Sequence, residues 1–245
     1  MKRYILWAVG LMMILNVSCE QGGEMGGDPN AEVSYGTLNL SAVAVTVEES
    51  TRAMSTDNFL VTLLKASGEE VESWTLGEMP DQVQLREGDY RVEVASATNH
   101  APVSREGYFS GGCELTIVSG KTTTPDPIVC PLESLKVSVE FRGEIVEAMS
   151  SDCGTTVSLE DASLRVAATD NAPIYFRPEG ERNTLKVVFA GTVDGASERF
   201  ETEIAGVRVG QWRHIVIKMT YEDGKRVFSA SSIDPWNKDE DIYVE

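Results

Sequence analysis

Residues 134–141 read SLKVSVEF, and the strict alternation in this stretch decides the fold class. Successive side chains of a β-strand point to opposite faces, so apolar residues at every second position mark one face that is buried. The apolar face comprises Leu135, Val137, Val139 and Phe141, and the polar face comprises Lys136, Ser138, Glu140 and Arg142. The stretch therefore predicts a half-buried strand.

The same alternation recurs along the chain. It predicts further strands within residues 36–48, 59–66, 90–94, 113–118, 163–168, 184–189 and 213–221. Residues 220–228 read TYEDGKRVF, and Asp223-Gly224 between two alternating runs is typical of a tight hairpin turn. Only GEIVEAM at 143–149 suggests a helix, of one or two turns. Short strands separated by Gly, Pro, Asp and Ser predict an all-β fold of antiparallel β-sandwiches of the immunoglobulin or transthyretin-like kind.

Length and composition set the number of domains. The chain has 245 residues, 42% hydrophobic and 24% charged, which is ordinary for a folded protein. A domain commonly takes about 100 to 150 residues, so two tandem sandwiches are expected. The run KTTTPDPIVCPLES at 121–134 holds three prolines and predicts a stiff connection, which places the sandwiches at 35–131 and 132–245. The net charge of -18 excludes nucleic acid as a partner.

The N-terminus carries the signals of export. Lys2 and Arg3 precede an apolar run, residues 4–15, that is too short to span a bilayer but suits a secretory signal peptide at 1–18. Cys19 follows directly and resembles the acylated cysteine of bacterial lipoproteins. Residues 19–34 are acidic and Gly-rich and predict a flexible tether. The chain is thus expected to bind a membrane through a lipid on Cys19; the alternative is an ordinary signal peptide.

Three further cysteines leave at most one intramolecular bridge. Cys113 and Cys130 flank a stretch that reads as two strands around a polar turn, so a cross-strand disulfide is one interpretation. Buried free thiols are the other.

A family resemblance rests on several segments in order. YGTLNLSAVAV at 35–45, TRAMSTDNFLVTL at 51–63, LREGDYRVEVAS at 85–96, GYFSGG at 107–112 and CPLESLKVSVEF at 130–141 resemble the Bacteroidales lipoproteins grouped as a domain of unknown function (the DUF 4493 group). The closing IDPWNKDEDIYVE is similar to the end of fimbrillin-like proteins. The resemblance implies a lipid-anchored β-sandwich protein at the outer surface, in adhesion or pilus assembly. It supplies no catalytic residues.

The polar segment EESTRAMSTDN at 48–58 holds the Arg52-Ala53 bond. Exposed polar loops of this kind are where proteases cut. The resemblance to fimbrillin precursors implies that an Arg-specific protease removes the first strand, 36–48, and that the vacated groove accepts a strand from a neighbouring subunit. A plain connecting loop is the alternative, and the frequency of arginine in loops favours it.

The long loop SATNHAPVSREGYFSGG at 96–112 is of the kind that often carries binding residues. Its Tyr108 and Phe109 are candidate aromatics for stacking on a sugar ring. Core packing is the expected role of at least one of them. The chain lacks G-x-S-x-G, H-E-x-x-H and P-loop motifs, and it has no Cys/His spacing for zinc. We therefore expect no enzyme activity, no cofactor and no metal site.

These observations together predict a non-enzymatic, lipid-anchored protein of the outer membrane, exposed at the cell surface. Its expected function is cell adhesion or a fimbrillin-like role as a subunit of a surface appendage, with other surface-protein subunits or glycans as partners. The alternative function is that of a carbohydrate-binding accessory lipoprotein in a polysaccharide-uptake system.

Overall fold

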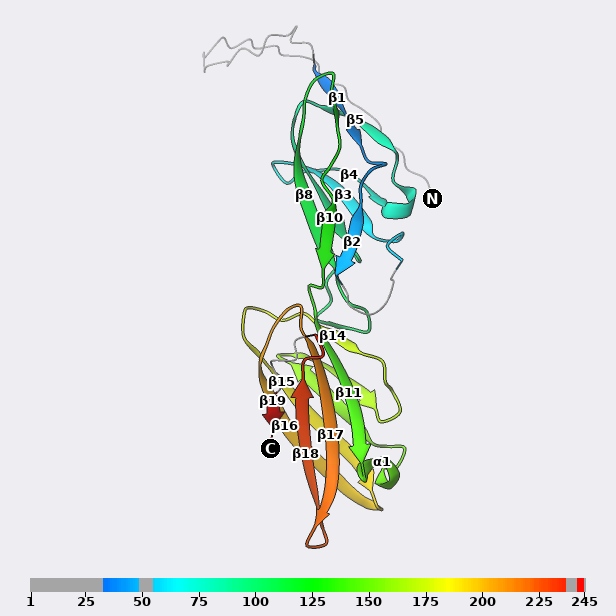
Figure 1. The fold of residues 1–245 in the computed structure, drawn as a ribbon, viewed down its shortest axis with the longest axis vertical. Helices are drawn as coiled ribbons and strands as arrows, with labels where there is room; N and C mark the ends of the chain where they lie inside the picture. The colour runs from blue at the N-terminus through cyan, green and yellow to red at the C-terminus, as the bar shows by residue number, and fades with distance from the viewer. Residues whose placement is uncertain (1–32, 49–54, 237–241, 245) are drawn as a thin grey trace, which may run out of the picture. The chain divides into compact units, whose positions relative to one another are not determined.

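The computed structural model describes residues 33–48, 55–236 and 242–244, and almost all regular structure in them is β-strand (Figure 1). The strands of the first half are β1 Tyr35–Asn39, β2 Val45–Glu48, β3 Leu60–Lys65, β4 Glu70–Thr75, β5 Gln82–Arg86, β6 Gly88–Ala95, β7 Val103–Ser104, β8 Ser110–Ile117, β9 Thr122–Thr123 and β10 Ile128–Pro131. A short 3₁₀ turn, Leu76–Glu78, follows β4.

The second half adds longer strands. They are β11 Leu135–Gly143, β12 Gly154–Leu159, β13 Ala162–Ala167, β14 Ile174–Phe176, β15 Asn183–Val193, β16 Ala196–Val207, β17 Trp212–Glu222, β18 Lys225–Ile233 and β19 Ile242–Val244. One helical turn, α1 at Ile145–Ala148, follows β11 (Figure 1).

The first half is built from three sheets around one hydrophobic cluster. A four-stranded sheet has the order β4-β3-β6-β8, a three-stranded sheet the order β5-β1-β9, and β10 pairs with β2. Their buried side chains meet in an N-terminal core, which includes Leu38, Leu63, Val92 and Ile128. A sandwich results because each sheet buries one face against the others.

The second half packs two sheets face to face. One has the order β19-β18-β17-β11-β14-β7 and the other the order β13-β12-β15-β16. The core between them holds residues from both sheets, among them Val137, Phe189, Ile204 and Ile217. Phe189 contacts both Phe141 and Phe228, with ring centroids 5.8 and 5.7 Å away.

The alternation in residues 134–141 places side chains as predicted. Leu135, Val137 and Val139 of β11 are buried in the core between the two sheets of the second half, which we call the C-terminal core. Ser138 and Glu140 lie on the opposite face of β11 and are half-buried. Asp223 and Gly224 both have positive φ, 49° and 72°, which is the conformation of a type I′ turn between β17 and β18. The single turn α1 lies within the segment expected to be helical.

The predicted all-β sandwich fold is confirmed, with two differences in detail. Three strand pairs are parallel: β1 with β9, β2 with β10, and β11 with β17. The Pro-rich run 121–134, predicted as a connection, contributes β9 and β10 to these pairs. Prolines are tolerated there because Pro125 and Pro127 lie between the two strands and Pro131 ends β10. The boundary near residue 132 stays a prediction.

Candidate functional site

The loop after β6 is held by a strand pair and by several side-chain contacts. Residues 96–109 contain β7, which pairs antiparallel with β14: Val103 lies opposite Phe176, and Ser104 opposite Tyr175. These strands follow the two Ala-Pro dipeptides of the chain, at 101–102 and 172–173. The segments that follow the two dipeptides are therefore neighbours that pair with each other.

Two arginines tie this loop to the second half of the chain. The Arg105 guanidinium donates to the Asp170 carboxylate at 2.7 Å and to the Ala172 carbonyl at 2.9 Å. Arg177 donates from its side chain to the His100 carbonyl at 2.9 Å and from its backbone to the Pro102 carbonyl at 3.0 Å. Hydrogen bonds to charged groups are stronger than neutral ones, so the loop is held in one conformation.

Tyr108 and Phe109 have different roles, although they are adjacent. Phe109 is 1% exposed and packs in the N-terminal core, which is the role expected of at least one of the two aromatics. Alternation explains this result, because neighbouring residues at the start of β8 face opposite sides. Tyr108 is half-buried and stacks on His100, with ring centroids 4.4 Å apart.

Ser134 connects the stacked pair to the start of β11. Its hydroxyl lies 3.0 Å from His100 Nε2 and accepts the backbone N–H of Tyr108 at 3.2 Å. Ser134 is 1% exposed, so its hydroxyl is shielded from water and these contacts provide its hydrogen-bond partners. Burial and the positive charge of Arg177 lower the pKa of His100, which keeps its imidazole neutral at pH 7.

These residues enclose a pocket of about 400 Å³, which we call the loop pocket. Its lining combines aromatic rings with neutral hydroxyl and amide groups: Ser55, Asn58, Phe59, Ser96, Ala97, Asn99, His100, Ala101, Ser104, Arg105, Glu106, Gly107, Tyr108, Phe109, Ser134 and Tyr175. Gly107 is needed for this packing, because a Cβ there would lie 2.9 Å from the Leu132 side chain and 3.0 Å from the Tyr175 ring.

A second feature is the position of the first strand. β1 lies between β5, with which it pairs antiparallel over five residues, and β9, with which it pairs in parallel. We call the space that β1 occupies the β1 slot. The Thr37 N–H donates to the Lys121 carbonyl at 2.9 Å, and the Gly120 N–H donates to the Tyr35 carbonyl at 2.8 Å. β1 thus has hydrogen-bonded neighbours on both of its edges.

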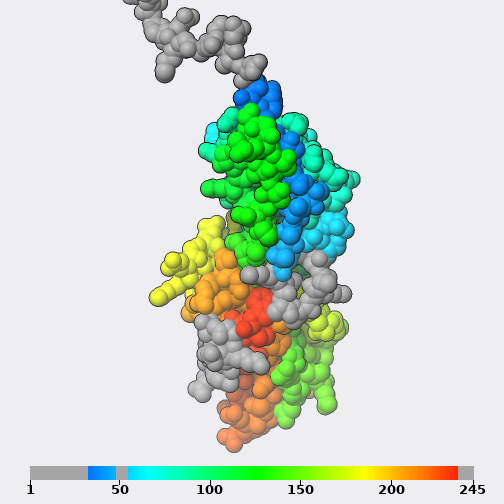
Figure 2. Space-filling model, turned by 45° about the horizontal axis from the view of Figure 1, so that its top comes forward, coloured from blue at the N-terminus to red at the C-terminus, as the bar shows by residue number. Residues whose placement is uncertain are grey.

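Side chains of this first segment fill the N-terminal core. Leu38 is fully buried and Leu40 is 1% exposed, while Val43, Val45 and Val47 pack against the core from its edge. Gly36 is required by close approach, because a Cβ there would lie 2.4 Å from the Val118 carbonyl oxygen. The blue first segment and the green segment that contains β10 are neighbours on the surface in Figure 2, as the pairing of β2 with β10 requires.

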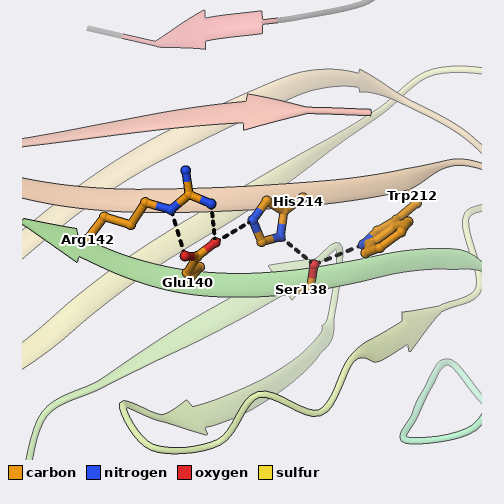
Figure 3. A network of polar contacts seen from close by, with 5 residues as sticks. All are labelled: Ser138, Glu140, Arg142, Trp212 and His214. Carbon is orange, nitrogen blue, oxygen red and sulfur yellow. Dashed lines mark hydrogen bonds and ion pairs between the residues drawn. The ribbon is translucent and has the colours of Figure 1, made fainter. Parts of the chain in front are cut away.

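A third feature is a chain of polar contacts on the outer face of β11 and β17 (Figure 3). Arg142 donates to both oxygens of Glu140, at 2.6 and 2.8 Å, and Glu140 Oε2 lies 2.8 Å from His214 Nε2. His214 Nδ1 lies 2.8 Å from Ser138 Oγ, which also accepts the Trp212 Nε1–H at 2.8 Å. The hydrogen bonds from the Arg142 guanidinium are the main reason that the pKa of Glu140 is lowered, and the hydrogen bond from His214 adds to the effect.

The donors and acceptors of this network fix one another. An ionised Glu140 only accepts, so His214 Nε2 carries the proton and Nδ1 accepts the Ser138 hydroxyl. Ser138, His214 and Glu140 therefore stand in the order used by serine hydrolases. Ser138 and His214 are paired within the β11–β17 ladder, and Ser138 Oγ is already engaged by both His214 Nδ1 and Trp212 Nε1. We interpret the network as a brace between two parallel strands.

The cysteines do not form the bridge that was one of the two interpretations. Cys113, Cys130 and Cys153 are all free thiols. Cys113 lies opposite Val92 in the β6–β8 pair, and Cys130 lies opposite Val47 in the β2–β10 pair, so the two are not partners in a hairpin. Burial raises the pKa of all three thiols.

Other predicted sites lie outside the described residues. These are Cys19 with the signal peptide and tether, and the Arg52-Ala53 bond. Within the described ranges, no group of three or more His, Cys, Asp or Glu side chains could hold a metal ion. In the same part of the chain, none of the helices has the length and apolar character needed to cross a membrane.

The fold and these features define an all-β sandwich protein with a braced loop pocket and an inserted first strand. The chain belongs to the family described as a domain of unknown function (DUF4493), which it matches over residues 34–245. No curated protein matches its sequence.

Three solved structures with a similar fold come from Parabacteroides and Bacteroides species. A fimbrial assembly protein from Parabacteroides distasonis shares 12% identity, with a TM-score of 0.50, over 87% of this chain and 99% of that one. Candidate polysaccharide binding proteins from Bacteroides thetaiotaomicron share 10% identity, with a TM-score of 0.48, over 85% and 98%. A candidate adhesin from Bacteroides ovatus shares 9%, with a TM-score of 0.47, over 87% and 96%. At 12% identity, the likeness to the fimbrial assembly protein establishes the fold alone.

Proposed function

We propose that this protein is a non-enzymatic, lipid-anchored cell-surface protein that acts in adhesion as a subunit of a surface appendage. The observation that carries the proposal is the position of β1 between β5 and β9, at the start of the described part of the chain. β1 is central in its sheet and precedes every other described strand, so cleavage after β2 would separate β1 and β2 without removing any later strand. The shared fold with a fimbrial assembly protein agrees with this function.

Removal of the first segment would leave an acceptor groove. Cleavage at Arg52-Ala53 would separate β1 and β2 from the rest of the chain. The exposed edges of β5 and β9 would then carry unpaired N–H and C=O groups, which are a template for an added strand. The cavities left by Leu38 and Leu40 would each favour an apolar side chain by about 1.5 to 3 kcal/mol.

The geometry also restricts which strand can enter. Position 36 of the β1 slot has no room for a Cβ, while positions 38 and 40 face the core. An incoming strand in the same register needs glycine followed by apolar residues two and four positions later. Main-chain hydrogen bonds would supply the affinity for the incoming strand, and the requirements at positions 36, 38 and 40 would supply the specificity.

The attachment proposal rests on the N-terminal sequence. Cys19 after a short apolar run is the expected acceptor of a lipid, and residues 19–34 provide a tether between that lipid and β1. Cleavage after Arg52 would also separate the subunit from Cys19. The uncleaved chain would thus be anchored through Cys19, and the cleaved subunit would be released from that anchor.

Limited proteolysis of the purified protein tests this function. An Arg-specific protease should produce a chain beginning at Ala53, and the cleaved protein should form oligomers on size-exclusion chromatography. An Arg52→Gln variant should stay intact and monomeric, whereas Arg182→Gln, at an exposed arginine in another loop, should behave as the wild type. Cleaved protein that remains monomeric, or that retains residues 34–52 under native conditions, would contradict the proposal.

A further inference from the structure

We propose that the loop pocket binds a neutral sugar, with the stacked His100–Tyr108 pair and neighbouring amide and hydroxyl groups as its recognition surface. This inference does not depend on strand addition, since the loop pocket is present in the intact chain. Its volume of about 400 Å³ lies in the range of small-ligand sites and accommodates a mono- or disaccharide.

The charges at the loop pocket argue against an anionic ligand. Arg105 is already bound to Asp170 at 2.7 Å, and Glu106 adds a negative charge to the lining. His100 is neutral at pH 7, because burial lowers its pKa. A phosphate or carboxylate would therefore meet no uncommitted positive charge in the described lining, and the net charge of -18 would repel it.

The polar groups of the lining argue against a purely apolar ligand. Asn58, Asn99 and Ser104 present amide and hydroxyl groups, which both donate and accept hydrogen bonds. An apolar molecule would remove water from these groups without replacing its hydrogen bonds, at a cost of about 1 to 3 kcal/mol for each group left unpaired. A sugar presents hydroxyls to such groups and an apolar C–H face to aromatic rings.

The loop pocket is organised before a ligand arrives. The pairing of β7 with β14 and the contacts of Arg105 and Arg177 fix the loop on the second half of the chain. Ser134 holds His100 and Tyr108 at their common wall. A braced site loses little conformational entropy on binding, which is a requirement for affinity to a small polar ligand.

The test uses the intact protein and defined sugars. Saturation-transfer NMR titrations would compare the methyl glycosides of glucose, galactose, mannose and N-acetylglucosamine with glucuronic acid and glucose 6-phosphate. We expect saturable binding of at least one neutral glycoside and weaker binding of both charged sugars. Failure of all four neutral glycosides to bind, or tighter binding of a charged one, would overturn the proposal.

Matched variants place the binding at the loop pocket. Ala97→Trp, an exposed lining position, should reduce affinity at least tenfold by filling the pocket, whereas Ala205→Trp, exposed on β16, should leave it unchanged. Asn99→Ala should weaken binding several-fold relative to Asn171→Ala, which removes an exposed amide outside the lining. Circular dichroism checks that each variant is folded, and binding that survives both Ala97→Trp and Asn99→Ala would overturn the assignment. Failure here leaves the protease experiment unaffected.

Discussion

Replacement of Phe109 by alanine should destabilise the protein strongly. Phe109 is 1% exposed within the N-terminal core, and alanine in place of a fully buried phenylalanine costs about 3 to 5 kcal/mol. The backbone contacts should survive, because the Phe109 N–H donates to Ser96 Oγ and its carbonyl accepts the Ser96 N–H, both at 2.9 Å. The decrease in the free energy of unfolding should therefore come from the loss of the Phe109 side chain alone. We expect a decrease of about 4 kcal/mol in the free energy of unfolding.

Replacement of the adjacent Tyr108 is the internal comparison. Tyr108 is half-buried, and its stack on His100 is worth about 0.5 to 1.5 kcal/mol beyond the area that it buries. Tyr108→Ala should cost about 1 to 2 kcal/mol. The two variants should thus differ by about 2 kcal/mol or more, although they remove neighbouring aromatic rings of similar size.

Urea unfolding followed by far-UV circular dichroism measures both values. The slope of the unfolding free energy with urea should stay constant, since neither variant changes the surface exposed on unfolding. Phe109→Leu serves as the control and should cost less than about 1.5 kcal/mol, because it keeps most of the buried volume. A cost below about 1 kcal/mol for Phe109→Ala, or a larger cost for Tyr108→Ala, would refute the assignment of Phe109 to the core.

Three further predictions follow from other parts of the structure. Gly36→Val should cost about 2 kcal/mol or more in urea unfolding, because a side chain at position 36 meets the Val118 carbonyl; a neutral effect would mean that β1 packs differently. Iodoacetamide should modify Cys113, which is half-buried, before Cys130 or Cys153 in the native protein, and a Cys113–Cys130 disulfide in peptide mass spectra would contradict the free thiols. Glu140 has a lowered pKa in the folded state, so its contribution to stability is present above its unfolded pKa and is lost as the pH falls through the folded value. The wild type should therefore lose its advantage over Glu140→Gln below about pH 4, and an advantage independent of pH would exclude the Arg142 and His214 contacts as its source.

Alternation in the sequence predicted strand identity well, because burial of one face leaves a period of two in every half-buried strand. β6, β11, β15 and β17 all fall where this period is clear. β4, β5, β12, β14 and β16 fall outside the predicted ranges, and β4 is mostly exposed and carries no such period. The parallel pairs of β1, β2 and β11 were also missed, since alternation does not distinguish parallel from antiparallel neighbours.

The loop pocket could be predicted only in part. The long loop and Tyr108 are visible in the sequence, but the partners His100 and Ser134 come from positions that show no motif. The structure pairs the strands that follow the two Ala-Pro dipeptides, β7 and β14, although they lie far apart in sequence. Long-range pairing of this kind depends on tertiary packing, and local sequence does not encode it.

Outer-face side chains of β11 were correctly predicted to be polar, but their function was not. Lys136 is 7% exposed, because Trp212 and Trp236 lie over it at 4.7 and 5.3 Å from the ring centroids to Nζ. His214 is held between Glu140 and Ser138. Contacts between β11 and β17 join residues more than 70 positions apart, which explains why local alternation does not reveal them.

N-terminal sequencing of the protein recovered from assembled material on native cells tests the central proposal most directly. Release of the first strand predicts a subunit that begins at Ala53 and carries no lipid. Assembled subunits that retain an intact Arg52-Ala53 bond would contradict strand exchange as the mode of assembly.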